Sequence, residues 1–329
     1  MAPLNTIKTP TRASIKRILV LSYSQTGQLA EITQSIVAPL QQCPHFSVHI
    51  ETLRPVHPYP FPWRFFSFLD AFPESAQMVA PSLHPLSLTG DEDFDLVILP
   101  YQVWFLAPSL PITAFLKHPL AKKLLMGKPV VTVIACRNMW MLAQEKTKSL
   151  LAACGARLLD NVAMVDPSST MTTLLTTPVW LLSGKRDLLP GLPPAGIDAA
   201  SIKAASRFGF ALRDALQNDQ ERGTAPLLTG LNAADSDPSL LFSEKAGTRS
   251  FHLWGKLLRT VGEPGQWHRR PFLLLYVCFL ITLILSVVPL SLLMQAVLRP
   301  FLQRKMALLK QKFDAPSGSG TERMALYEL

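Results

Sequence analysis

Short apolar runs alternate with amphipathic stretches along the first half of the chain. Short apolar runs bounded by polar turns are typical of buried strands, whereas apolar positions at three- and four-residue spacing indicate helices. Strands that alternate with such helices predict an α/β fold, a doubly wound parallel sheet covered on both faces. The five predicted strands are Ile18–Leu21, Ser47–Thr52, Phe94–Pro100, Lys128–Cys136 and Arg157–Val165.

The pattern changes in the last third of the chain. Ile197–Gln217 has helical spacing and is expected to be the last helix on the sheet, followed by a Gly-, Ser-, Asp- and Pro-rich linker at Asn218–Arg249. Pro271–Leu298 then contains 28 residues without a charged side chain. Because about 20 apolar residues span the hydrocarbon core of a bilayer, we expect a membrane segment there. Pro289 interrupts it, so that a single crossing and a re-entrant hairpin both fit.

These patterns divide the chain into an α/β domain, a linker, a membrane segment and two basic tails. The domain carries one insertion and one extension, and the linker ends in a juxtamembrane segment. In residue numbers the parts are the N-terminal tail 1–16, the domain 17–217 with insertion 53–91 and extension 166–194, the linker 218–270, the membrane segment 271–298 and the C-terminal tail 299–329.

The charge distribution indicates which partners the chain could bind, and the cysteine spacing indicates whether it has disulfides or a metal site. Most of the formal net charge of +9 falls between Phe251 and Lys312, on both sides of the apolar segment, which predicts anionic membrane lipid as a partner. No nucleic-acid-binding motif is visible, so nucleic acid is not an expected partner. The four cysteines form no CxxC pair, which argues against a disulfide framework and a metal site. The N-terminus has no apolar signal region, and we expect the domain at the cytoplasmic face of the inner membrane.

The loop after the first strand has the chemistry of a phosphate site. It runs straight into the helical pattern Gln28–Leu40, so its hydroxyls, its glycine and the free N–H groups of the helix start lie together. It has no lysine and no Walker pattern, which favours a monoester phosphate such as that of FMN. An ordinary capped turn is the alternative. The candidate phosphate-binding residues are Ser22, Ser24, Gln25, Thr26, Gly27 and Gln28.

The loops after the third and fourth predicted strands carry aromatic and amide side chains. In doubly wound sheets ligands bind beyond the carboxyl ends of the strands, so these loops are expected to meet the phosphate loop at one edge. A flavin ring needs apolar walls and hydrogen-bonding partners at its rim. Core packing is the alternative for each aromatic residue. Three loops at one edge favour a flavodoxin-type FMN site, and the candidate ring-binding residues are Tyr101, Gln102, Val103, Trp104, Phe105, Cys136, Arg137, Asn138 and Trp140.

Two further segments have less certain roles. Leu53–Ser75 is dense in proline and aromatic residues. It could form a lid for an apolar substrate, pack on the domain as an additional helix, or dip into the membrane interface. Asp166–Pro194, with its run of threonines, extends the active site or caps the domain.

Four segments together carry a resemblance to a known family. They read SYSQTGQL, PYPFPWRFFSFLDAFPES, LPYQVWFLAPSLPITAFLK and ACRNMWMLAQEK. Over Lys16–Lys185 the chain resembles the flavodoxin-like family of dialkylresorcinol condensing enzymes. The resemblance implies a bacterial enzyme that works beside a ketosynthase and aromatises a dialkylcyclohexanedione, an apolar cyclic diketone, to a dialkylresorcinol. The loops hold no Cys-His or Ser-His nucleophile that would support condensation, so a flavin oxidation fits these residues better.

The expected reaction removes two hydrogens from the diketone. Tyr101, His57 and Tyr59 are the candidate proton acceptors, and Arg137 is the candidate group to stabilise an enolate oxygen. An electron carrier without a substrate pocket, an NAD(P)H-quinone reductase and an FMN-free scaffold that recruits a ketosynthase are the alternatives. The basic charge and the aromatic loops favour the enzyme over the carrier, and the intact loop hydroxyls argue against the scaffold.

Overall fold

The structure of the chain is a computed structural model that describes residues 15–327, and for 287–289 and 291–302 it describes the backbone alone. The N-terminal tail therefore lies almost entirely outside the described residues. The helices and strands are β1 (Lys16–Ser22), α1 (Gln28–Gln41), β2 (Phe46–Thr52), α2 (Phe65–Ala76), β3 (Leu96–Trp104), β4 (Ala107–Pro108), α3 (Leu110–Lys117), α4 (Pro119–Leu125), β5 (Pro129–Cys136), α5 (Met141–Ala153), β6 (Arg157–Val165), α6 (Thr170–Ser183), α7 (Ala199–Ala204), α8 (Ser206–Gln217), α9 (Leu241–Val261) and α10 (Arg270–Asp314).

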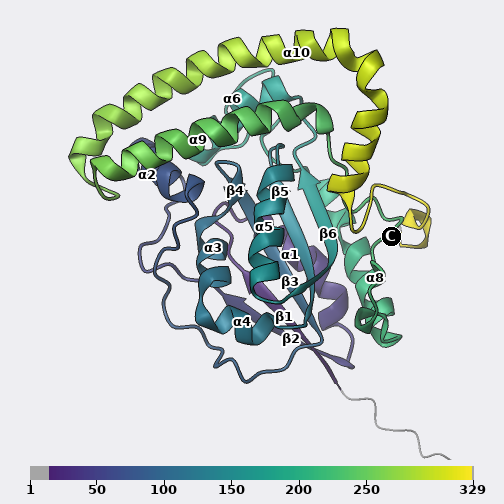
Figure 1. Cartoon of the computed structure of the whole chain (residues 1–329). Helices are drawn as coiled ribbons and strands as arrows, with labels where there is room; N and C mark the ends of the chain where they lie inside the picture. Colours follow the sequence, from purple (N-terminus) through teal and green to yellow (C-terminus); the bar gives the residue numbers. More distant parts are fainter. Residues whose placement is uncertain (1–14, 328–329) are drawn as a thin grey trace, which may run out of the picture.

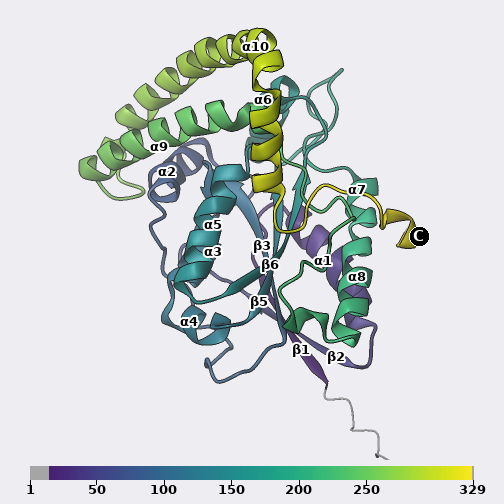
Figure 2. The ribbon, with the colours of Figure 1, turned by 45° about the vertical axis from the view of Figure 1, so that its right-hand side comes forward.

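Five parallel strands form the central sheet in the order β2-β1-β3-β5-β6, and the short β4 pairs antiparallel with the end of β3. This is the flavodoxin-like strand order, in which the chain reverses direction beside β1. Figures 1 and 2 show α1 and α8 on one face of the sheet and α3, α4 and α5 on the other. The predicted doubly wound α/β fold is confirmed.

Strand β1 shows how the sequence builds two cores. Its four consecutive apolar residues are fully buried, and neighbouring side chains point to opposite faces of the sheet. Ile18 and Val20 join the core under α1 and α8, whereas Leu19 and Leu21 join the core under α3, α4 and α5. A continuous apolar run is therefore needed here, because neither face of this strand meets water.

Helices α1 and α8 pack closely on the first face. At Gly209 of α8, a Cβ atom would lie 2.0 Å from the carbonyl oxygen of Ile36 on α1. Since real Cβ atoms do not come so near a backbone oxygen, only glycine allows this approach. The helix predicted at Ile197–Gln217 is thus present as α7 and α8, and it covers the sheet as expected.

The segment expected as a linker is part of the domain. Leu227, Leu228 and Leu231 are buried in the core of the first face. The N–H groups of Leu227 and Leu228 donate to the carboxylate of Asp160 on β6, at 2.8 and 3.1 Å. Helix α9 then begins at Leu241, inside the same predicted linker. The prediction of a linker was wrong. Its scattered leucines pack into the core of the first face, and this core surface exists only once the sheet has formed.

Helices α2, α9 and α10 pack together beyond the carboxyl ends of the strands (Figure 1). The ring of Tyr276 on α10 stacks on Phe72 of α2 with centroids 4.3 Å apart. Arg269, fully buried just before α10, lies 3.2 Å from both Asp70 and Glu74 of α2. The insertion therefore packs on the domain as an additional helix, which is one of the three roles expected for it.

Helix α10 contains the whole of the predicted membrane segment. The helix runs through Pro289 without ending, so no hairpin turn occurs there. Its far end returns to the α/β domain, where Asp314 accepts from the backbone N–H of Ser236 at 2.7 Å and Lys310 pairs with Asp235. Among the described residues, Trp267–Ser286 is the one stretch long and apolar enough to cross a membrane, with 17% of it buried.

The C-terminal segment after α10 is also packed and not a free tail. The Ser317 hydroxyl donates to Asp160 at 2.7 Å. Further on, the backbone N–H groups of Asn232 and Ala234 donate to the carbonyl oxygens of Gly320 and Gly318. Both ends of α10 are thus fastened to one body.

Candidate functional site

The β1–α1 loop presents free hydrogen-bond donors. The first intrahelical bond of α1 runs from Glu31 N–H to Gly27 C=O, and the N–H of Ala30 donates to the Ser24 hydroxyl. Among the described residues the N–H groups of Gln28 and Leu29 have no acceptor, as is usual in a first helical turn. The helix dipole adds a partial positive charge at this point, so the loop suits an anion.

Two of the predicted loop side chains are engaged elsewhere. Gln28 is buried and makes a pair of hydrogen bonds with the backbone of Ile197, at 2.9 and 3.0 Å. The Gln25 amide donates to the carbonyl oxygen of Pro60 at 2.9 Å. These glutamines tie the loop to its surroundings. An anion would therefore meet the backbone of the loop and the hydroxyl of Thr26, for which no partner lies among the described residues.

Two buried amide oxygens without a partner lie at the carboxyl ends of β3 and β5. They are Oε1 of Gln102 and Oδ1 of Asn138. The other end of the Asn138 amide donates to the Thr170 hydroxyl at the start of α6, at 3.2 Å. A buried acceptor without a donor costs free energy, about 1–3 kcal/mol, unless a ligand supplies the donor. Both side chains were predicted to meet the rim of a flat ring.

Arg137 adds a cation to this edge. Its guanidinium donates to the sulfur of Met139 at 3.9 Å and forms no ion pair with a carboxylate among the described residues. Burial lowers the pKa of Arg137 to about 10, against the opposing effects of Cys136 and Asp166, so the side chain stays charged at neutral pH. A half-buried cation of this kind favours an anionic group on a bound ligand.

Aromatic rings form one wall of the edge. Trp104, at the end of β3, makes edge-to-face contacts with Tyr23, Tyr59 and Trp63, with centroids 5.0–6.0 Å apart. Burial raises the pKa of Tyr59 to about 12, and the charge of Glu74 adds to this. Its phenol is therefore protonated at neutral pH and can donate a hydrogen bond.

The aromatic wall continues without a break to α10. From Trp63 it passes through rings with centroid distances of 4.3–5.8 Å, which belong to α2, to the loop after β3 and to α10. The members of this chain of rings, in order, are Trp63, Phe68, Phe105, Phe72 and Tyr276. Phe105 thus lies in this wall, as part of the packing between the domain and the helices above it.

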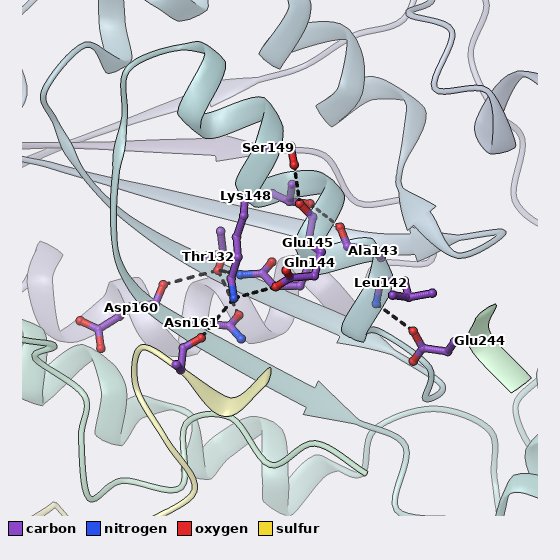
Figure 3. Close-up of polar contacts among 12 residues, drawn as sticks. Thr132, Leu142, Ala143, Gln144, Glu145, Lys148, Ser149, Asp160, Asn161 and Glu244 are labelled. Atoms are coloured by element: carbon purple, nitrogen blue, oxygen red, sulfur yellow. Dashed lines mark hydrogen bonds and ion pairs between the residues drawn. The ribbon is translucent and has the colours of Figure 1, made fainter. Parts of the chain in front are cut away.

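Tyr101 lies away from the edge, contrary to the prediction. It is fully buried, and its hydroxyl donates to Oε1 of Gln144 on α5 at 2.6 Å. Gln144 in turn donates to Thr132, and Thr132 donates to Asn161, at 3.0 Å each (Figure 3). The physical reason is strand geometry, because Tyr101 and Gln102 are neighbours on β3 and must point to opposite faces.

The other predicted site residues lie partly in the core and partly at the surface. Trp140 is buried beneath the start of α5, and Val103 packs on the same core. Cys136 ends β5, and burial raises the pKa of its thiol, so it is held protonated. His57 is exposed in the loop that precedes α2.

A cavity of about 600 Å³ adjoins this edge on the β6 side. Its lining does not include the β1–α1 loop. It comes from the loop after β5 and the start of α5, from the end of β6, from α7 and α8, from the segment 232–240 with the start of α9, and from the C-terminal segment. Among the lining residues are Asn138, Met139, Asp166, Arg207, Glu244 and Met324.

Glu244, on α9, is the residue that sequence reasoning missed. Its carboxylate is fully buried and accepts the N–H groups of Met141 and Leu142 at the start of α5, at 3.3 and 2.8 Å (Figure 3). It therefore fixes the helix that follows the Arg137–Trp140 loop. Its only signal in the sequence was that it is an acid within a basic stretch, which does not reveal a contact over such a separation.

Comparisons with known proteins give remote likenesses. No family model and no curated protein matches the chain. A flavoprotein in complex with FMN from Lactobacillus acidophilus NCFM is 15% identical, with a TM-score of 0.37, over 45% of this chain and 93% of that one. Candidate flavoproteins from Bacteroides eggerthii DSM 20697 and Bacteroides uniformis ATCC 8492 are 17% and 12% identical. Their TM-scores are 0.33 and 0.35, and the matches cover 45% and 52% of this chain and 87% and 97% of theirs. At this distance the fold assignment rests on the strand order itself.

Proposed function

We propose that this chain binds FMN at the carboxyl edge of its sheet. The observation that carries the proposal is the pair of partnerless amide oxygens on Gln102 and Asn138, at the ends of two neighbouring strands. A flavin ring has an N–H group at its polar rim, which suits such acceptors. The phosphate would meet the donors of the β1–α1 loop, and Arg137 would lie near the ring. The crystallised FMN complex among the remote likenesses agrees with this choice of cofactor.

The reaction proposed for this site is the aromatisation of a dialkylcyclohexanedione to a dialkylresorcinol. It is supported by the resemblance over Lys16–Lys185 and by the aromatic wall, which suits an apolar substrate. When bound, FMN would supply the hydride acceptor for this two-electron oxidation. The diketone would lose a hydride from one ring carbon and a proton from its neighbour, and enolisation of both ketones would complete the aromatic ring. A ketosynthase is the proposed source of the diketone.

This chain's own residues would position the substrate and handle the proton. Arg137 would stabilise the oxygen that gains negative charge as the proton leaves. Tyr59 would donate a hydrogen bond to the second ring oxygen, because its raised pKa keeps the phenol protonated. His57 is the remaining candidate to take the proton, since Tyr101 is buried away from the site.

The test measures flavin content first and turnover second. Purified protein is expected to contain FMN in a one-to-one ratio, measured by its visible spectrum and by mass spectrometry after release. Thr26→Ala and Gln102→Leu are expected to weaken FMN binding about tenfold each, which corresponds to the loss of one hydrogen bond to a buried or charged group. Thr224→Ala, at an exposed threonine next to the amino end of β6, is the matched control and should bind FMN as the wild type does.

The second stage separates the enzyme from its alternatives. Under anaerobic conditions a dialkylcyclohexanedione should bleach the flavin absorbance and yield one resorcinol per flavin. Protein that binds no FMN would contradict the whole proposal. Protein that binds FMN and is reduced by NAD(P)H but not by the diketone would be a quinone reductase or an electron carrier instead.

A further inference from the structure

Exposed apolar side chains gather beyond the carboxyl ends of the strands. Helices α6, α9 and α10 lie together at that end of the molecule in both ribbon views (Figures 1 and 2). Nine large apolar residues on these helices are between 51% and 71% exposed, although helices of a water-soluble domain turn such residues inward. We call six of them the apolar cap: Met171 and Leu175 on α6, Leu253 on α9, and Leu275, Ile281 and Leu285 on α10.

Both ends of α10 are fastened to the α/β domain, the start beside α2 and the end beside Asp235 (Figure 1). At its start Arg269 is buried between Asp70 and Glu74. At its end Lys310 pairs with Asp235 and with Asp314, the second at 3.0 Å. Measured along its bent path (Figure 1), this helix of 45 residues is about 68 Å long, more than twice the thickness of a hydrocarbon core of about 30 Å. A crossing helix would place its ends on opposite sides of the bilayer, which these contacts forbid.

The charge around the cap identifies its occupant as an anionic surface. On α9, Lys245, Arg249 and Lys256 are exposed, whereas the acid of that helix, Glu244, is fully buried. A second copy of the chain would bring like charges together, which disfavours self-association through this face. An anionic bilayer can bury the apolar side chains among its acyl chains and attract the basic side chains to its headgroups.

We infer that the apolar cap inserts into one leaflet of an anionic bilayer and that α10 lies along the membrane interface without crossing it. The inference does not depend on the proposed function. If both hold, the proposed FMN site lies at the end of the sheet that faces the lipid surface.

The first experiment distinguishes lying along the membrane from crossing it. The full chain is synthesised in the presence of preformed vesicles that contain phosphatidylglycerol, in a Cys278→Ser background. Thr321→Cys reports the C-terminal segment and Glu31→Cys reports the α/β domain, and both positions are exposed. With a membrane-impermeant maleimide, both are expected to react equally before detergent is added. Protection of the position-321 variant until detergent is added would show a crossing and overturn the inference.

The second experiment tests the cap itself by vesicle flotation. The wild type is expected to float with phosphatidylglycerol vesicles and several times less with pure phosphatidylcholine. The double variant Leu275→Asp/Leu285→Asp should lower the bound fraction by at least about tenfold, because both carboxylates must leave water. Leu326→Asp, at a leucine that is 72% exposed outside the cap, should float as the wild type does.

Two results would overturn the identity of the occupant. A wild type that does not float with either vesicle would exclude a membrane role for the cap. A wild type that forms a dimer without vesicles, with Leu275→Asp/Leu285→Asp monomeric, would make the cap an interface between copies. Circular dichroism of the double variant must match the wild type, and a single Leu285→Asp variant replaces it if the double variant does not fold.

Discussion

Glu244 gives the folded protein a pH-dependent stability that can be measured. Burial raises the pKa of its carboxyl from 4.5 to about 7, against the opposing effects of the Leu142 and Met141 N–H groups and of Lys146. In the unfolded chain the group has its ordinary pKa. Between these two values the folded protein therefore holds a proton that the unfolded chain has released. The contribution to stability is fully present below pH 4.5 and is lost as the pH rises through about 7.

The size of this effect follows from the two pKa values. At about 1.4 kcal/mol for each pH unit, the interval from 4.5 to about 7 corresponds to about 3 kcal/mol. Glu244→Gln keeps an oxygen that accepts from the start of α5 but cannot titrate. The free energy of unfolding of this variant, relative to the wild type, should therefore rise by about 3 kcal/mol between pH 4.5 and about pH 7.5.

Urea unfolding followed by circular dichroism across this pH range measures the difference. Glu263→Gln, at an exposed glutamate in the loop between α9 and α10, is the matched control and should follow the wild type. The difference in free energy of unfolding between Glu244→Gln and the wild type could instead change by less than about 1 kcal/mol over this pH range. That result would show that burial does not raise the pKa of Glu244, and it would refute the reasoning.

Three other results are expected. Gly209→Ala should cost about 3 kcal/mol in urea unfolding, because its Cβ would lie 2.0 Å from the Ile36 oxygen, and an unchanged midpoint would contradict the close approach. Arg269→Ala should cost about 3 kcal/mol by removing the buried cation that pairs with Asp70 and Glu74, of which Glu74 keeps Arg259 at 3.7 Å, and a neutral effect would contradict this ion-pair cluster. FMN at about a hundred times its Kd should stabilise the protein by about 2.7 kcal/mol in thermal melts, and a melting temperature independent of FMN would count against binding.

The sheet could be predicted because β1, β5 and the first part of β3 are largely apolar runs, and β2 and β6 could be placed by their alternation with helical patterns. Strand β3 extends beyond Pro100 to Trp104. Tyr101 and Gln102 remain in register with Ile134 and Ala135 of β5, although a tyrosine and a glutamine after a proline resemble a loop. That extension also explains why the two predicted site residues lie in different places. Gln102 lies at the carboxyl edge of the sheet, whereas Tyr101, its neighbour on the strand, points into the core.

The C-terminal half was harder to predict because its structure depends on distant partners. Leu227 and Leu228 look like isolated leucines in a polar stretch until Asp160 of β6 holds their N–H groups. Pro289 is a helix-breaking signal in sequence, yet α10 continues through it. Glu244 contacts the start of α5 across about a hundred residues, a separation that no local pattern records.

The tryptophans of the aromatic wall give the protein a built-in optical reporter. Trp63 and Trp104, 5.7 Å apart, lie at the proposed flavin edge, whereas Trp267 is 74% exposed in the loop before α10. A flavin absorbs where tryptophan emits, so FMN at the edge would quench by energy transfer the blue-shifted emission, which comes from the buried Trp63, Trp140 and Trp180 and from the half-buried Trp104. The red-shifted emission of Trp267 would respond instead to lipid. One emission spectrum would therefore separate cofactor occupancy from membrane attachment, without a label on the chain.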